Sequence, residues 1–218
     1  MESSMRSPRG DTLARQIRDA LAERIRRGEL LPGARLKDSE VAAAFGTSTT
    51  PAREALRLLM RDGLAEILPY RGCVVASVDA REIAEILDVH SAIVGFTARA
   101  AARRLTDEQW RALEAAVDDY ERAVAAGERR QAAGRFHRLL IEAAGNRVLK
   151  RVHQYLANRL LLASDACLDA LAEGMPYREI LAALRARDAE RIDDVVAEQL
   201  ARSRQMVHTA LETADEQG

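Results

Sequence analysis

The stretch "GTSTTPAREALRLLMRDGL", residues 46–64, decides how the first third of this chain folds. Apolar residues recur in it at the three-and-four spacing of a buried helical face: Ala52, Leu56, Leu59 and Met60. Arg53, Arg57 and Arg61 follow another face at a spacing of four, and like charges stacked in this way disfavour a free helix. Glu54 can offset Arg57, but nothing acidic sits within reach to offset the whole row. The row therefore indicates either a solvated basic face or a helix that lies against an external polyanion.

The segments on either side of this helix predict two more helices and a hairpin. A helix begins at Asp11 and ends at Gly28, with one apolar face made of Leu13, Ile17, Leu21 and Ile25. A turn at Pro32-Gly33 and a short helix over about 38–45 follow. Ser48 or Thr50 can cap the next helix, over about 49–61, with Pro51 in its first turn.

Two β-prone runs around residues 69–72 complete this part of the chain as a hairpin. Three helices and a hairpin predict a winged helix-turn-helix over residues 11–77, after a flexible lead at 1–10. The remainder contains only helical patterns, which predicts an all-α domain over 78–212 and a flexible tail at 213–218. Its expected helices are 80–104, 107–126, 128–144, 147–168, 176–187 and 189–212. The predicted fold class is therefore mainly α, with a small antiparallel wing and a six-helix bundle.

Composition supports a helical protein and excludes several classes. Of 218 residues, 48% are hydrophobic but only 4% are aromatic, and no run approaches the roughly 18 apolar residues of a membrane span. Cys73 and Cys167 lie far apart and match no metal-ligand spacing, which favours a reduced cytoplasm. The net charge is −1, but residues 1–78 hold 13 basic against 10 acidic residues and the remainder 20 against 24. A basic first third is typical of a DNA-binding domain joined to a different kind of domain.

The order of these features resembles the GntR-type bacterial transcriptional regulators, specifically the FadR subfamily with its helical FCD domain. "GELLPGARL" (28–36) and "TPAREALRLLMRDGL" (50–64) are similar to that family's amino-terminal motifs. "GRFHRLLIEAAGN" (134–146) and "REILAALRARDAERI" (178–192) carry a looser resemblance in the second domain. The resemblance implies a sequence-specific DNA-binding regulator, dimeric and more often a repressor, whose partners are double-stranded operator DNA and a small organic effector.

The resemblance also implies which residues contact DNA. The helix over 49–61 would be the recognition helix, entering the major groove by its amino-terminal end. The implied DNA-binding residues are Arg35, Lys37, Ser48, Thr49, Thr50, Arg53, Arg57, Arg71 and the wing-tip Gly72. Thr49 departs from the family, which typically has a base-reading Arg at that position. Threonine cannot make the bidentate contact with guanine, so a different operator is expected.

A second departure concerns the metal centre of one Asp and three His that many FCD domains carry. Aligned on the family's motifs, the Asp position is Ala133 and the histidine positions are His137, Tyr177 and Gln199. One imidazole cannot hold a divalent ion where three or four ligands are needed. His153 and His208 could substitute in principle, but neither occupies a motif position. We therefore expect no metal and no cofactor.

The polar residues left at those positions indicate a pocket for an organic effector. His137, Tyr177 and Gln199 would converge with His90. In the resemblance, His90 stands where many relatives have Arg, and Val94 stands where they have Glu. A pocket with fewer charged residues than in those relatives predicts an effector that is weakly charged and more apolar, bound by direct hydrogen bonds. Alternatively, His137 is an ordinary core histidine, Tyr177 covers a crevice and Gln199 is exposed.

Two other classes of function remain in competition with the effector-responsive regulator. One is a constitutive DNA-binding regulator whose effector pocket has decayed, which the lost metal ligands favour. The other is an enzyme, but the sequence has no phosphate-binding glycine loop, no nucleophile with a partnered base and no paired carboxylates on a motif. We therefore expect no catalytic residues.

Overall fold

The computed structural model describes residues 8–215, and its contacts divide the chain into two units, with the first ending at Val78 and the second beginning at Asp79. Residues 1–7 of the expected lead and 216–218 of the expected tail lie outside the described part. The first helix begins at Pro8 and the last ends at Asp215, so the helices take in three residues of the expected lead and three of the expected tail.

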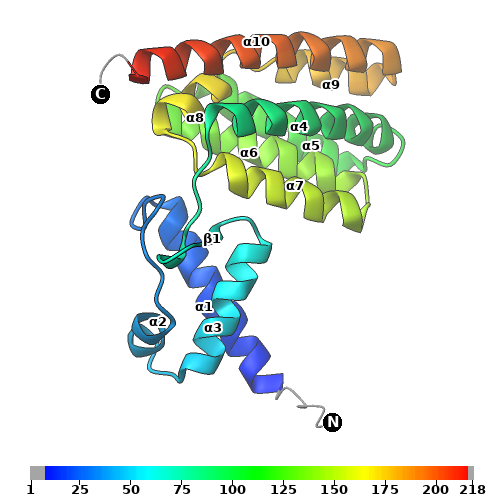
Figure 1. Ribbon diagram of the computed structural model, residues 1–218. Helices are drawn as coiled ribbons and strands as arrows, with labels where there is room; N and C mark the ends of the chain where they lie inside the picture. The colour runs from blue at the N-terminus through cyan, green and yellow to red at the C-terminus, as the bar shows by residue number, and fades with distance from the viewer. Residues whose placement is uncertain (1–7, 216–218) are drawn as a thin grey trace. The chain divides into compact units, whose positions relative to one another are not determined.

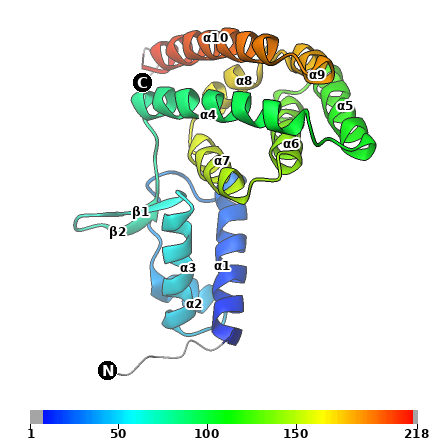
Figure 2. The ribbon, with the colours of Figure 1, turned by 90° about the vertical axis from the view of Figure 1, so that its right-hand side faces the viewer.

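The first unit contains three helices and a two-stranded antiparallel sheet (Figure 1). Its elements are α1 (Pro8–Arg26), α2 (Asp38–Ala44), α3 (Thr49–Arg61), β1 (Ala65–Leu68) and β2 (Gly72–Val75). The strands pair from Ala65 with Val75 to Leu68 with Gly72, which leaves a three-residue turn. Figure 2 shows this hairpin projecting sideways from the helices of its own unit. The expected winged helix-turn-helix is confirmed.

The apolar stripes of α1 and α3 pack against each other and form the core of this unit. Ile17 and Leu59 are fully buried and Leu21 is nearly so. Each buried side chain of this size contributes about 1.5–3 kcal/mol relative to an exposed one. The apolar face of α3 is therefore committed to the core, and its other faces are available to solvent or a ligand.

The second unit contains seven helices within the described residues, one more than the sequence predicted. They are α4 (Ala80–Ala101), α5 (Asp107–Arg122), α6 (Ala126–Ala143), α7 (Arg147–Leu160), α8 (Asp165–Ala172), α9 (Tyr177–Ala186) and α10 (Ala189–Asp215). The prediction of a single helix over 147–168 was wrong, because a turn after Leu160 separates α7 from α8. Ser164 starts α8 by accepting a hydrogen bond from the Cys167 backbone N–H at 3.3 Å. Such a cap begins a new helix without glycine or proline.

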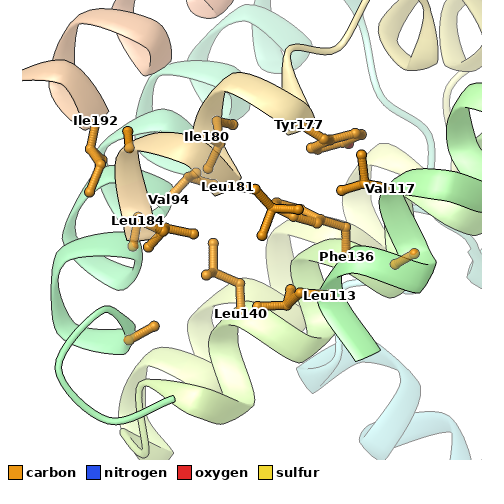
Figure 3. Packing of buried hydrophobic residues seen from close by; sticks show 14 of the residues in the cluster. Val94, Leu113, Val117, Phe136, Leu140, Tyr177, Ile180, Leu181, Leu184 and Ile192 are labelled. Atoms are coloured by element: carbon orange, nitrogen blue, oxygen red, sulfur yellow. The ribbon is translucent and has the colours of Figure 1, made fainter. Parts of the chain in front are cut away.

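The core of the second unit gathers side chains from α4, α5, α6, α9 and α10 (Figure 3). Phe136 and Tyr177 are its largest fully buried side chains, with ring centroids 4.4 Å apart. Tyr120 packs edge-on to Tyr177 at 4.9 Å and donates its hydroxyl hydrogen to the Ala172 carbonyl at 2.7 Å. The same hydroxyl accepts the Met175 N–H at 2.8 Å, so the segment leading into α9 is held on the core.

None of the helices in residues 8–215 combines the length and apolar character that crossing a bilayer would require.

Candidate functional site

The amino-terminal end of α3 presents polar groups that no side chain covers. Ser48 occupies the N-cap position but its hydroxyl makes no capping hydrogen bond, and Thr49 and Thr50 in the first turn are exposed. The first N–H groups of a helix have no partner within the helix and carry the positive end of its dipole. This end of α3 can therefore receive an anion such as a DNA phosphate.

Each arginine of the α3 row has an acidic neighbour, so the expectation that nothing acidic lies within reach to offset the whole row was wrong. Arg53 donates two hydrogen bonds to Oδ2 of Asp38 in α2, from Nε at 3.0 Å and from Nη2 at 2.7 Å. Nη1 of Arg57 lies 3.6 Å from Oε2 of Glu54, as expected. Nε of Arg61 lies 3.6 Å from Oδ1 of Asp62, the next residue. Asp38 was missed because it lies 15 residues before Arg53, and only the packing of α2 on α3 brings them together.

The Arg53–Asp38 pair orders the most amino-terminal arginine of the row. The hydrogen bond from Arg53 lowers the pKa of Asp38 below its usual value, so Asp38 is a carboxylate at neutral pH. The Arg53 side chain is nonetheless 61% exposed, so the interaction is screened by solvent and is weak. DNA can replace Asp38 as the partner of Arg53 at little cost.

The other predicted DNA-contact residues lie at two further places in this unit. Arg71 is exposed in the hairpin turn, and Gly72 begins β2 with a φ of +75° that favours glycine. The backbone of Arg35 forms a β-bridge with Val74 of β2, and its side chain is exposed. Lys37 occupies the N-cap position of α2 without a capping hydrogen bond and forms an ion pair with Glu40.

Tyr70, which was not among the predicted DNA-contact residues, is fully exposed in the same turn as Arg71, with a φ of +61°. An aromatic side chain in a short hairpin turn lies too far from the apolar core to be buried. The position of Tyr70 in the predicted turn could therefore have indicated that its ring is exposed.

Three histidines from three helices come together inside the second unit. The ring of His90 in α4 lies 5.0 Å from that of His137 in α6 and 5.5 Å from that of His153 in α7, measured between centroids. His137 and His153 are 6.3 Å apart. Tyr177 joins them from α9, with its hydroxyl 3.2 Å from His137 Nε2. We call these four residues the histidine cluster.

The imidazoles of the histidine cluster are neutral at physiological pH. Burial lowers the pKa of His90 to about 4, and the neighbouring His153 contributes to the shift. Burial, then the charges of His90 and His153, lower the pKa of His137 well below its usual value. Burial and the charge of Arg138 lower that of His153.

Burial also raises the pKa of Tyr177 well above its usual value, so the phenol stays protonated. The geometry between Tyr177 and His137 therefore fits a phenol that donates to an unprotonated Nε2.

Gln199 is buried, which excludes the alternative that it faces solvent, but its direct contacts are not with the histidine cluster. Its Nε2 lies 3.1 Å from Ser203 Oγ and 2.7 Å from Met175 Sδ. Its Oε1 is buried without a hydrogen-bond partner among the described residues. A buried acceptor left unpaired is costly, so this oxygen is suited to a donor that arrives with a ligand.

His153 was considered in the sequence but excluded from the predicted site because it matches no family motif. A local signal could have placed it: with Leu149, Leu156 and Leu160 it forms one stripe of α7, and the structure buries it to 7% exposure. The described residues contain no group of three or more histidine, cysteine or acidic side chains arranged to hold a metal ion. The three imidazoles are therefore close without forming a recognisable ligand set.

Comparison with known proteins agrees with this architecture. The family model "Bacterial regulatory proteins, gntR family" matches residues 13–75, and the "FCD domain" model matches residues 85–202. The "Probable D-xylose utilization operon transcriptional repressor" of Paenarthrobacter nicotinovorans is 33% identical over 187 residues, covering 82% of this chain and 81% of the relative.

Solved structures of similar fold include McbR/YncC of E. coli and a GntR transcriptional regulator of Rhodococcus sp. RHA1. The first has a TM-score of 0.66 at 22% identity, covering 90% of this chain and 97% of that one. The second has a TM-score of 0.68 at 20% identity, covering 93% and 99%.

A winged helix-turn-helix joined to a helical FCD domain defines a DNA-binding transcriptional regulator with an effector-binding domain. The matching families and relatives are regulators and not enzymes. The chain belongs to the gntR family of bacterial regulatory proteins.

Proposed function

We propose that this protein is a homodimeric repressor of the FadR subfamily that acts in the cytoplasm and leaves its operator when a small organic effector binds in the second unit. The relative from Paenarthrobacter nicotinovorans is named a repressor, which supports that direction of control. Two winged helices that read two related half-sites have far greater specificity than one, which supports a dimer.

The DNA surface in this proposal is the amino-terminal end of α3 with the wing. Ser48, Thr49 and Thr50 meet the major groove, where a threonine methyl can pack on thymine and a hydroxyl can bond a base or a phosphate. Arg53 leaves Asp38 and takes a phosphate or a base edge instead. The remaining contacts are to the phosphate backbone, made by Arg35, Lys37, Arg57, Arg71 and the Gly72 backbone.

The effector site in this proposal is the histidine cluster, and the observation that carries it is the convergence of three imidazoles and one phenol from four helices. Burial keeps the imidazoles of His90 and His137 neutral, yet both side chains keep some accessible surface. Each neutral imidazole offers one donor and one acceptor, and none offers a charge for a dicarboxylate. The buried Oε1 of Gln199 supplies one more acceptor. The set fits a weakly charged ligand that carries both donors and acceptors.

The same residues support an effector bound without a metal. Ala133 offers no donor atom, and the protonated phenol of Tyr177 and the amide of Gln199 are poor ligands for zinc or nickel.

Control of DNA binding by the effector then follows from a population shift. An effector that binds one arrangement of the second unit more tightly lowers the share of molecules competent to hold the operator.

The test begins with an operator selected from a random DNA pool and measured by gel shift. D-xylose, other pentoses, polyols and, for contrast, malonate and citrate are added in turn, and each is also tested for a rise in melting temperature. We expect an uncharged compound to stabilise the protein and release the DNA, and His137→Ala to abolish the release while leaving DNA binding intact. Glu142→Ala, an exposed change on the same helix, is the matched control. Release by citrate alone, through a bound metal, would contradict the proposal.

A constitutive regulator with a decayed pocket is the second candidate. The hydrogen bond between Tyr177 and His137 favours it, because these polar groups satisfy each other without a ligand. A protein that binds its operator but responds to no compound in either assay, even across broad metabolite pools, would support this candidate.

A further inference from the structure

An open cavity lies between α5 and α6, and none of its lining residues belongs to the proposed DNA surface or to the histidine cluster. Its volume is about 490 Å³, which is within the usual range for small-molecule sites. Two of the lining residues are alanines, and the others are charged or polar: Asp119, Arg122, Glu128, Gln131, Arg135 and Arg138. We call this cavity the α5–α6 groove. A wall with so few apolar residues is suited to a hydrophilic ligand.

The groove forms because α5 and α6 are joined by a short connection and pack along their length. Arg129 near the start of α6 donates a hydrogen bond to the Ala123 carbonyl at 3.2 Å. Arg135, further along α6, donates to the Ala115 carbonyl at 3.2 Å. A step forward along α6 is therefore a step back along α5, so the two helices run antiparallel. The end of α5 and the first turns of α6 consequently line the same groove.

The arginines of the groove use only part of their hydrogen-bonding capacity within the protein. Asp119 serves two of them, because Arg122 donates to its Oδ1 at 3.1 Å and Arg135 pairs with its Oδ2. Nε of Arg135 is nevertheless buried without a hydrogen-bond partner among the described residues. Arg138 forms no ion pair within the described part of the chain. A buried donor left unpaired is costly, so an added acceptor at this place would be favourable.

The position of Arg138 depends on Gly134, one turn earlier on α6. A Cβ atom at residue 134 would lie 3.4 Å from Nη1 of Arg138, so the guanidinium lies back along the helix over the glycine. Long side chains on a helix point towards its amino-terminal end, and on α6 that is the direction of the groove. Arg138 therefore brings to the groove a positive charge that has no counter-ion among the described residues.

The charges of the groove indicate the chemistry of a ligand. Three arginines face two carboxylates, of which Asp119 is already paired. Glu128 lies in the first turn of α6 and accepts the Ala125 N–H at 3.5 Å. The planar fork of a guanidinium matches the oxygens of a phosphate, whereas a carboxylate and the amide of Gln131 form hydrogen bonds with hydroxyl groups. A ligand with one phosphate and several hydroxyls fits both kinds of group.

We propose that the α5–α6 groove binds a small phosphorylated sugar or polyol, with its phosphate on Arg135 and Arg138 and its hydroxyls towards Glu128 and Gln131. A phosphate monoester carries about −1.5 to −2 charges at neutral pH and three acceptor oxygens, so it can engage two arginines at once. This site is separate from the proposed effector site. It gives the second unit a second ligand and does not depend on the identity of the effector.

The first test is calorimetric titration of the full-length protein at low ionic strength with glycerol 1-phosphate, ribose 5-phosphate and glucose 6-phosphate. Inorganic phosphate and ribose are the controls. We expect at least one of the three esters to bind at least about tenfold more tightly than inorganic phosphate, and ribose not to bind. Inorganic phosphate that binds as tightly as every ester overturns the sugar or polyol. No binding by any of the three esters overturns the site.

The second test places the bound ester by substitution. Arg138→Gln breaks no ion pair of the described residues and is expected to weaken binding at least about tenfold, whereas Arg103→Gln, at an exposed arginine of the same unit, is expected to leave it unchanged. Gln131→Glu keeps the size of the side chain, adds a negative charge to the groove and is expected to weaken binding about tenfold. Gln205→Glu, the same exchange at an exposed position of α10, is its matched control.

The Gln131 variant also separates the groove from the histidine cluster. Arg138 lies close enough to His153 for its charge to lower the pKa of that imidazole, so Arg138→Gln alone would also weaken a ligand held at the cluster. Gln131 belongs to the groove and not to the cluster. Ester binding that falls in both variants, with circular dichroism unchanged, supports the groove. Ester binding that Gln131→Glu leaves unchanged overturns it.

Discussion

Acidification is expected to destabilise the second unit through His90. The folded pKa of His90 is about 4 and its usual value is 6.5, so between these values the unfolded chain takes up a proton that the folded chain does not. The contribution of His90 to the free energy of unfolding is therefore complete above about pH 7, and it is lost as the pH drops through 6.5 towards 4. Between about pH 7.5 and about pH 5 this one group lowers the free energy of unfolding by about 2 kcal/mol, because one pKa unit corresponds to about 1.4 kcal/mol. His137 and His153, whose pKa values are also lowered, add to the loss in the same direction.

The measurement is urea unfolding at each pH, followed by the fluorescence of Trp110, the only tryptophan, which lies in α5 of the second unit. His90→Gln keeps a polar side chain and removes the titration, so its loss of stability over this range should be about 2 kcal/mol smaller than that of wild type. Ser91→Gln introduces the same side chain one residue along and should keep the full pH dependence. The protein concentration is held constant, because a dimer links stability to concentration. A His90→Gln curve parallel to that of wild type would refute the reasoning.

Three other predictions concern DNA and metal. Arg53→Ala should weaken operator binding by about 1–3 kcal/mol in a gel shift, and an unchanged midpoint with the fold intact would remove α3 from the DNA surface. Thr49→Arg should move the motif selected from random DNA towards guanine at one symmetric pair of positions, whereas an unchanged motif would mean that Thr49 faces away from the bases. Purified protein should hold far less than one equivalent of zinc, nickel, cobalt or manganese by elemental analysis, and chelation should change neither the melting temperature nor operator affinity. Near-stoichiometric metal that His137→Ala removes would contradict that expectation.

Local sequence was sufficient for the elements whose formation depends on near neighbours. The apolar spacing of residues 46–64 predicted a helix over about 49–61, and α3 spans those residues. Three of the side chains that define the period, Ala52, Leu56 and Leu59, are buried, and α3 packs against α1. Thr106 and Gln109 form a capping box at the start of α5, and this cap depends on local sequence because both of its hydrogen bonds join residues three apart. The break after Leu160 was missed because Ser164 gives a weaker signal than glycine or proline.

Tertiary structure alone decided which distant side chains meet. Nothing in the spacing of α3 could show that Asp38 pairs with Arg53, because that contact depends on how α2 packs across α3. The sequence supplied His90 and His137 as candidates, but His153 entered the cluster only once α4, α6 and α7 were packed together. The periodicity of a helix determines which residues share its face. The packing of one helix on another depends on all the side chains between them, and it decides which faces come into contact and which remain exposed.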